Sequence, residues 1–183
     1  MFEIIDDFLP QEVIDQFRER SLSETYVNQR FVGGYNSFDI HSDTISPLLI
    51  DYFKDKIPIL RDKIFTRGWS FIYDNICDGV NPHADPSIVN VNIWITPDEC
   101  VEDFNKNGLI LYDKEAPDDM SYEKYNNDYQ FIINYLKDSK YTIVPYKYNR
   151  AVVFSGKTFH ATNKVHMKPG HNNKRINYTF LFD

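Results

Sequence analysis

The apolar residues follow a helical period near the start of the chain and a strand-like pattern through most of the remainder. Residues 10–17 and 46–57 each combine an early proline with apolar side chains spaced as on one face of a helix, which predicts two helices. We expect a further helical stretch at 60–64, a short strand at 2–8 and a loop at 33–37.

Short strands dominate from residue 69 onward. In the segment 87–95, valine and isoleucine side chains occupy one face, while Asn90, Asn92 and Trp94 occupy the other. A polar, tyrosine-rich insertion covers 113–140 and contains one more expected helix, at about 127–137. Further strands are expected at 69–74, 108–112, 141–145, 150–154 and 175–182.

Helices that precede a run of strands, with no helix between successive strands, argue against a doubly wound parallel sheet. The pattern favours a fold that is mainly β with some α, in which an antiparallel sandwich or barrel carries a helical layer on one side. A length of 183 residues suits one domain with a sizeable core. We therefore expect a single domain over 1–183, with N-terminal helical support at about 1–66 and a β core at about 69–183.

Charge and composition restrict the class of partner. The net charge is −7, so general binding to the phosphate backbone of nucleic acids is disfavoured. No apolar stretch approaches the roughly 20 residues that span a bilayer, and the first residues lack the basic start of a secretory signal. Cys77 and Cys100 form no metal-binding motif and are interpreted as free thiols of a reducing compartment. These features predict a cytoplasmic protein without a membrane segment.

The pattern histidine-any-aspartate occurs twice, as His41-Ser42-Asp43 and as His83-Ala84-Asp85. The first copy lies between a loop and a helix start, where Asp43 is interpreted as a turn or capping residue. The second copy directly precedes the strand at 87–95. Residues two apart on an extended backbone point to the same side, so His83 and Asp85 can bind one ion together. The alternative is a loop histidine beside a solvated aspartate.

His160 is the best-placed third ligand. It follows an apolar strand and a Ser-Gly-Lys turn, which in a barrel can bring it beside the first pair. On an extended chain His166 would lie roughly 20 Å from His160, so only one of these two histidines can meet the ion. Two imidazoles and one carboxylate on one face of an octahedral Fe(II) leave positions open for a cosubstrate and dioxygen.

Arg175 begins the last expected strand. Its planar fork of N–H donors can hold a carboxylate through two parallel hydrogen bonds. An arginine that points into a core is costly unless it is paired, so the functional interpretation is a partner for the carboxylate of a bound cosubstrate. The alternative is a cation at the edge of a strand, with its head in solvent.

These residues together resemble the motif of the Fe(II)/2-oxoglutarate-dependent oxygenase superfamily, with His83-Ala84-Asp85, His160 and Arg175 in the expected order. The resemblance covers about 69–182, and the opening segment 2–10 is similar to that of many prolyl-hydroxylase-like members. Further segments that look like an uncharacterised microbial branch of such proteins are 90–99, 108–112 and 159–160.

The resemblance implies a double-stranded β-helix, or jelly roll, as the core, flanked by N-terminal helices. It implies a dioxygenase that uses Fe(II), 2-oxoglutarate and O2, releases succinate and CO2, and hydroxylates a peptidyl proline, an amino acid or a small metabolite. His83, Asp85 and His160 would then be the catalytic iron ligands, and Arg175 would hold the 5-carboxylate of 2-oxoglutarate.

Tyr73 and Asn92 are candidates for further contacts to the carboxylates of 2-oxoglutarate. Tyr73 precedes His83 on a strand, as a tyrosine does in prolyl hydroxylases. The alternatives are a tyrosine packed in a strand and an asparagine in a satisfied hydrogen bond. The insertion at 113–140 is interpreted either as a cover for the site or as a plain surface excursion.

Two other functions are compatible with the same motif. Asn177 after Arg175 is similar to nucleic-acid demethylases of the superfamily, but residues 180–182 lack the second arginine that those enzymes carry, and the acidic charge weakens this alternative. A jelly-roll binding module without catalysis would leave the histidines with a structural role. Halogenases of the superfamily lack the carboxylate ligand, so Asp85 argues against that activity.

Overall fold

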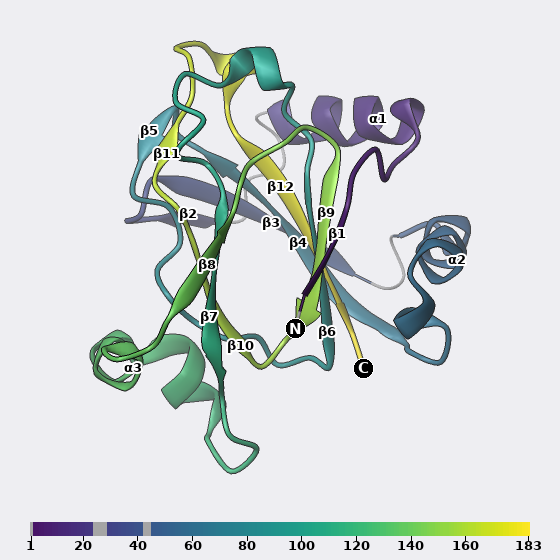
Figure 1. The fold of residues 1–183 in the computed structure, drawn as a ribbon. Coiled ribbons are helices and arrows are strands. Elements are labelled where there is room, and N and C mark those ends of the chain that lie inside the picture. Colours follow the sequence, from purple (N-terminus) through teal and green to yellow (C-terminus); the bar gives the residue numbers. More distant parts are fainter. Residues whose placement is uncertain (1, 24–28, 42–44) are drawn as a thin grey trace.

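The computed structural model describes residues 2–23, 29–41 and 45–183, which form antiparallel sheets with helices around them (Figure 1). The strands of a seven-stranded sheet are, in spatial order, β1 (Phe2–Ile5), β9 (Arg150–Ser155), β6 (Val89–Trp94), β12 (Ile176–Phe182), β4 (Phe65–Tyr73), β3 (Tyr35–His41) and β2 (Gln29–Phe31). The strands of a three-stranded sheet are β10 (Thr158–Thr162), β7 (Leu109–Glu115) and β8 (Tyr141–Val144). A two-stranded ribbon consists of β11 (Val165–His166) and β5 (Ile76–Cys77). The fold is therefore mainly β and antiparallel, as predicted.

Both helices predicted near the start of the chain are confirmed. α1 (Gln11–Leu22) and α2 (Pro47–Lys56) lie on the same side of the large sheet, away from the small sheet (Figure 1). α3 (Tyr129–Leu136) lies beside the small sheet and confirms the helix expected in the insertion. Single turns are η2 (Pro58–Leu60), η3 (Asp98–Cys100), η5 (His171–Asn173) and the π-helical η4 (Glu123–Asn127). None of the helices among the described residues is long and apolar enough to cross a membrane.

Two local expectations were wrong. The helical stretch expected at 60–64 is only the single turn η2, because β4 begins at Phe65 and pairs with β12 and β3. The loop expected at 33–37 ends early, because Tyr35 begins β3, which pairs with β4 along its whole length. Gly34 makes the turn with a φ of 84°, and a Cβ there would lie 2.4 Å from the Cβ of Cys77. The N-terminal part of the chain therefore contributes strands to the large sheet as well as helices.

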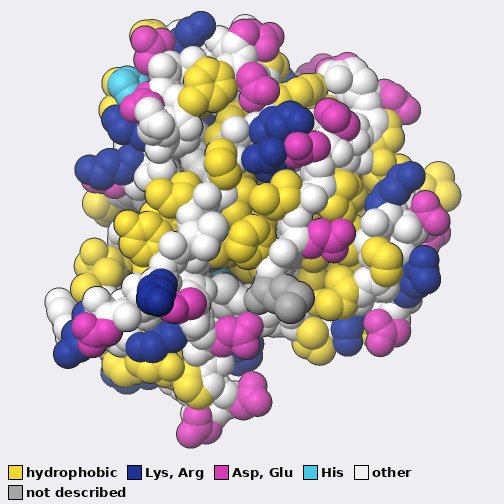
Figure 2. Space-filling model, viewed as in Figure 1, with side chains coloured by type: hydrophobic (Ala, Val, Ile, Leu, Met, Phe, Trp, Pro, Cys, Tyr) yellow, Lys and Arg dark blue, Asp and Glu magenta, His cyan; other side chains and the backbone are white. Residues whose placement is uncertain are grey.

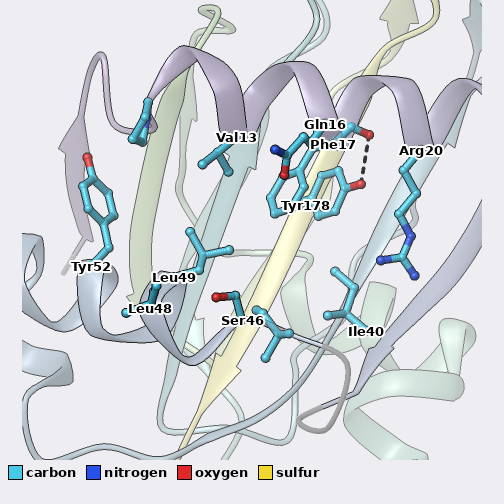
Figure 3. Close-up of a pocket in the computed structure, with 12 residues that line it drawn as sticks. Val13, Gln16, Phe17, Arg20, Ile40, Ser46, Leu48, Leu49, Tyr52 and Tyr178 are labelled. Atoms are coloured by element: carbon cyan, nitrogen blue, oxygen red, sulfur yellow. Dashed lines mark hydrogen bonds between the residues drawn. The ribbon is translucent and has the colours of Figure 1, made fainter.

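The outer core lies between the large sheet and the two N-terminal helices. The valine and isoleucine face of β6 and the residues Tyr178 and Phe180 of β12 pack there against α1 and α2. Phe17 of α1 stacks on Tyr178 with ring centroids 4.1 Å apart, and the Tyr178 hydroxyl donates to the Phe17 carbonyl (Figure 3). Each such aromatic side chain stabilises the fold by roughly 1.5–3 kcal/mol through removal of apolar area from water.

A second core lies between the large and small sheets. Trp94 and Phe154 from the large sheet pack there with Leu109 and Leu111 from the small sheet. Because side chains alternate along a strand, the polar residues of β6 and β12 face this same interior. They form a buried polar column within an otherwise apolar space: Asn90, Asn92, Asn177 and Thr179. Burial on both faces explains why every residue of β6 and β12 is buried.

Candidate metal centre

The histidines of the predicted triad are joined through their backbones. His83 N–H donates to the His160 carbonyl at 3.0 Å, and His160 N–H donates to the His83 carbonyl at 2.8 Å. This isolated antiparallel bridge connects the loop before β6 to the strand β10. The ring centroids of the two histidines consequently lie 4.3 Å apart.

Asp85 completes the cluster that the sequence predicts. Its carboxylate oxygens lie 3.7 Å from His83 Nε2 and 3.4 Å from His160 Nε2. One ligand atom from each of the three residues can be chosen so that all lie within 4.8 Å of one another. This is the only such group of three or more metal-ligating side chains in the part of the chain that the structure describes.

Both imidazole rings are held with the same nitrogen toward the cluster. His83 Nδ1 lies 2.8 Å from the Asn81 carbonyl, and His160 Nδ1 lies 2.9 Å from the Thr158 carbonyl. A carbonyl oxygen only accepts hydrogen bonds, so each Nδ1 carries the proton. Nε2 is then the nitrogen of each ring that faces the carboxylate, and in a neutral ring this nitrogen has the lone pair that binds a metal.

The charges in the cluster also fit a metal. Burial, aided by the neighbouring His160, lowers the pKa of His83 to about 4, so the ring is neutral at pH 7. Burial by itself raises the pKa of Asp85, but hydrogen bonds and charge from His160, together with His83 and Asn90, bring it below the ordinary value. A neutral imidazole therefore stands beside a charged carboxylate.

Asp85 is 1% exposed, and the salt bridges seen among the described residues give it no lysine or arginine partner. A buried carboxylate without a fixed cation is unfavourable. A divalent cation held by the three side chains would remove that cost, and two imidazoles with one carboxylate suit Fe(II). The Asn90 side chain supports Asp85 by donating to Oδ2 at 2.7 Å, and Ser87 in turn donates to Asn90.

Arg175 is buried, with 1% of its surface exposed, so the alternative of a strand-edge cation in solvent is wrong. Its Nε donates to the Asn107 carbonyl at 2.8 Å and its Nη1 to Asn177 Oδ1 at 2.9 Å. Its guanidinium carbon lies 4.6 Å from the centre of the Tyr73 ring. Both hydrogen-bond partners are uncharged, and five donors are available, so the guanidinium retains capacity for an anion.

Tyr73 and Asn92 lie in one narrow cavity with the three residues of the triad. The Tyr73 hydroxyl lies 3.1 Å from Thr162 Oγ1, and Asn92 Nδ2 donates to Thr179 Oγ1 at 3.1 Å. Asn92 Oδ1 is buried and has no hydrogen-bond partner. Such an atom is rare in folded proteins and has capacity to accept a hydrogen bond from a water or a bound molecule. Arg175 does not line this cavity itself but contacts Tyr73 and Asn177, which do.

The other histidines lie elsewhere. His41 ends β3 opposite Arg67, while Ser42 and Asp43 fall outside the described residues. His166 pairs with Ile76 in the two-stranded ribbon, and His171 Nε2 lies 2.8 Å from the Leu22 carbonyl. The choice of His160 over His166 is therefore in agreement with the observed cluster.

The insertion contributes contacts that the sequence did not predict. Ala84, between the candidate ligands His83 and Asp85, donates its N–H to the Tyr125 carbonyl at 2.9 Å. Its carbonyl accepts from Asn126 Nδ2 at 2.8 Å. Both partners belong to the π-helical turn η4, a rare element that is frequent at functional sites. Nothing in the local pattern signals a contact between segments so far apart in the chain.

Comparison with known proteins defines the fold. No family model matches the sequence, and no curated protein matches it. Solved structures match along nearly the whole chain. HygX from Streptomyces hygroscopicus, with nickel and 2-oxoglutarate bound, is 10% identical with a TM-score of 0.62, over 99% of this chain and 82% of HygX. A prolyl-4-hydroxylase from Pseudomonas putida is 11% identical with a TM-score of 0.62, over 99% of this chain and 91% of the enzyme.

A third similar structure is the non-haem α-ketoglutarate-dependent carbocyclase SnoK of nogalamycin biosynthesis. It is 12% identical with a TM-score of 0.66, over 99% of this chain and 79% of SnoK. At these identities the likeness defines the fold, which is the one seen in 2-oxoglutarate-dependent oxygenases. The predicted resemblance is confirmed at that level.

Proposed function

We propose that this protein is an Fe(II)- and 2-oxoglutarate-dependent dioxygenase whose metal ligands are His83, Asp85 and His160. One observation carries the proposal: the buried Asp85 carboxylate lies 3.7 and 3.4 Å from two Nε2 atoms. When bound, iron and 2-oxoglutarate supply the oxidising chemistry, in which 2-oxoglutarate and O2 are consumed and succinate and CO2 are released. The side chains of this chain hold and orient these groups.

Arg175 is proposed to hold the 5-carboxylate of 2-oxoglutarate. Two observations support this role: Arg175 is buried, and both of its hydrogen-bond partners are uncharged. The 5-carboxylate would therefore pair a guanidinium that has no carboxylate partner among the described residues. Tyr73 and Asn92 are proposed as further contacts, through the Tyr73 hydroxyl and the unpaired Asn92 Oδ1. The cavity lining, which includes both residues and the triad, supports this assignment.

We further infer that the two main sheets form a double-stranded β-helix in a single domain over 1–183, with support from about 1–66 and the core at about 69–183. The likeness to a prolyl-4-hydroxylase favours hydroxylation of a small molecule or peptide. On the face shown in Figure 2, basic and acidic side chains are interspersed, without the continuous basic stripe that nucleic-acid binding favours.

The test is a visible charge-transfer band on addition of Fe(II) and 2-oxoglutarate to the purified protein without oxygen. We expect the wild-type protein to give the band and Asp85→Ala to lose it, because the variant removes one of the three ligands. Asp51→Ala, an exposed carboxylate of α2, is the matched control and should keep the band. A wild-type protein without the band, or an Asp85→Ala variant that retains it, would refute the metal assignment.

A further inference from the structure

A cleft of about 530 Å³ lies in front of the proposed metal centre. His83 and Asp85 line both this cleft and the narrow cavity of the triad, so a molecule in the cleft lies against two of the proposed ligands. The volume falls in the range of pockets that bind small molecules. The chemistry of its walls therefore bears on which molecule the site accepts.

One side of the cleft is an aromatic wall, formed by Phe31, Tyr35, Trp69 and Phe71. These rings contact one another: Phe31 stacks on Tyr35 with centroids 4.6 Å apart, and Tyr35 meets Phe71 edge-on at 5.0 Å. Mutual packing restricts the rings, so the wall is a rigid apolar surface. Such a surface favours a flat or ring-shaped group, which buries much area and loses little entropy.

Arg67 lies at one end of this wall. It lines the cleft two positions before Trp69 on β4, and its guanidinium carbon lies 5.7 Å from the centre of the Trp69 ring. Among the described residues that line the cleft, it is the only lysine or arginine, and Asp85 is the only carboxylate. No ion pair of Arg67 with a described residue is seen. A guanidinium in this position selects a carboxylate or phosphate group.

The insertion supplies a polar part of the lining. Tyr122, Asn126, Asn127 and Tyr129 all border the cleft. Ala84 is hydrogen-bonded to both Tyr125 and Asn126 of this segment. These bonds attach the segment to the loop that carries His83 and Asp85, so the positions of the segment and of these proposed ligands are coupled. The amides provide donors and acceptors that can orient a bound molecule without adding charge.

We propose that the cleft binds a small organic acid that carries a ring, with the ring against the aromatic wall and the anionic group at Arg67. That this acid is the molecule oxidised rests on the proposed function; its binding in the cleft does not. A single basic side chain fits one anionic group and disfavours an oligonucleotide, which needs several phosphate contacts. A carboxylate and a phosphate can each pair with the Arg67 guanidinium, and the experiment distinguishes which of the two anionic groups the cleft prefers.

The experiment measures binding to the full chain, without added metal, by isothermal titration calorimetry. The probes are indole-3-acetate with its neutral partner indole-3-acetamide, and phenyl phosphate with its neutral partner phenol. We expect at least one acid to bind about tenfold more tightly than its partner. Preference for indole-3-acetate alone identifies a carboxylate as the anion, and preference for phenyl phosphate alone identifies a phosphate.

Two variants locate the binding. Arg67→Gln should abolish the preference for the acid, whereas Arg61→Gln, an exposed arginine that does not line the cleft, should leave it unchanged. Trp69→Leu should weaken the binding of acid and neutral partner by the same factor, because both lose the ring contact. Circular dichroism of each variant identifies any that fails to fold, and Phe71→Leu, at another residue of the aromatic wall, then replaces Trp69→Leu.

Three results overturn the proposal: neither acid binds more tightly than its neutral partner, the preference persists in Arg67→Gln, or excess 2-oxoglutarate displaces the acid. The last result would place the acid at Arg175 instead of in the cleft. The charge-transfer band, recorded on separate samples of the same protein with Fe(II) and 2-oxoglutarate added, reports on the proposed function. Loss of the band with retained Arg67-dependent binding refutes the oxygenase assignment and leaves the cleft assignment intact.

Discussion

The guanidinium of Arg175 lies against the face of the Tyr73 ring, 4.6 Å from its centre, in the interior between the two sheets. Tyr73 lines the cavity of the triad, and Arg175 lies next to it without lining that cavity. Burial raises the pKa of the Tyr73 hydroxyl, although the Arg175 charge opposes this, so the phenol is protonated at neutral pH. The phenol and the guanidinium together offer donors to an anion that reaches them from the proposed metal centre.

Substitution of Arg175 by methionine separates a structural role from a role in cosubstrate binding. Methionine removes a buried cation, which offsets part of the cost of leaving the Asn107 carbonyl and Asn177 Oδ1 without their donor. We expect Arg175→Met to lower the free energy of unfolding by about 1–3 kcal/mol. The affinity for 2-oxoglutarate should fall about 100-fold, or ~2.7 kcal/mol, as measured by calorimetry with a redox-inert metal.

The control for this substitution is Arg150→Met. Arg150 pairs with Asp6 and donates to the Pro145 carbonyl, outside the proposed cosubstrate site. It should leave the affinity for 2-oxoglutarate unchanged. Equal affinity in Arg175→Met and wild type would assign the anchor for the 5-carboxylate to another residue.

Asn90 is predicted to position Asp85 for the metal. It donates to Asp85 Oδ2 and is itself fixed by Ser87, so Asn90→Ala frees the carboxylate to rotate. Loss of an outer hydrogen-bond partner typically lowers metal affinity about 10- to 100-fold, and we expect a drop of that size in a Co(II) titration. Asn134→Ala, an exposed position on α3, is the control. Unchanged Co(II) affinity in Asn90→Ala would leave Asn90 with a purely structural role.

The stability of the metal-free protein should fall as the pH falls from 7 to 5. The His83 pKa is about 4 in the folded protein, against an ordinary value of 6.5, so the unfolded chain binds a proton that the folded chain excludes. The contribution of His83 is therefore complete above pH 6.5 and is lost toward pH 4. Between pH 7 and 5 the loss is about 2 kcal/mol, and the lowered pKa of Asp85 acts in the same direction at lower pH.

Urea denaturation at pH 7 and pH 5, with a chelator present, measures this effect. His83→Gln should show a smaller loss of stability between the two pH values than wild type. His171→Gln changes a histidine that is exposed and outside the cluster, and should behave as wild type. If the free energy of unfolding fell equally between pH 7 and pH 5 in the two variants, the lowered pKa of His83 would be contradicted.

Asn126 is predicted to hold the insertion against the loop that carries His83 and Asp85. Asn126→Ala removes the hydrogen bond to the Ala84 carbonyl, whereas Asn127→Ala removes only a contact with Glu123 inside the same segment. We expect faster hydrogen exchange at the Ala84 amide in Asn126→Ala than in Asn127→Ala, because local opening of the segment exposes that amide. Mass spectrometry of peptides that span 80–90 measures the difference. Identical exchange in both variants would show that the backbone contact with Tyr125 is sufficient.

Much of the architecture was predictable from local pattern. The spacing of apolar residues in α1 and α2 and the alternation in β6 depend only on the periods of helix and strand, which are properties of the local backbone. β3 was missed because polar and apolar residues do not alternate cleanly in 35–41, and the segment is held in the sheet by its pairing with β4. Such long-range pairing leaves little trace in a short window of sequence.

The sequence by itself determined which side chains are candidate ligands: His83 and Asp85, because two residues separated by one position share a side of an extended chain, and His160 as the best-placed third. Only the tertiary structure decided that His160 joins them, through backbone hydrogen bonds between distant segments. It also decided that Arg175 is buried and that the insertion contacts Ala84. These facts depend on the packing of two sheets, and the free energy of that packing comes from residues spread over the whole chain.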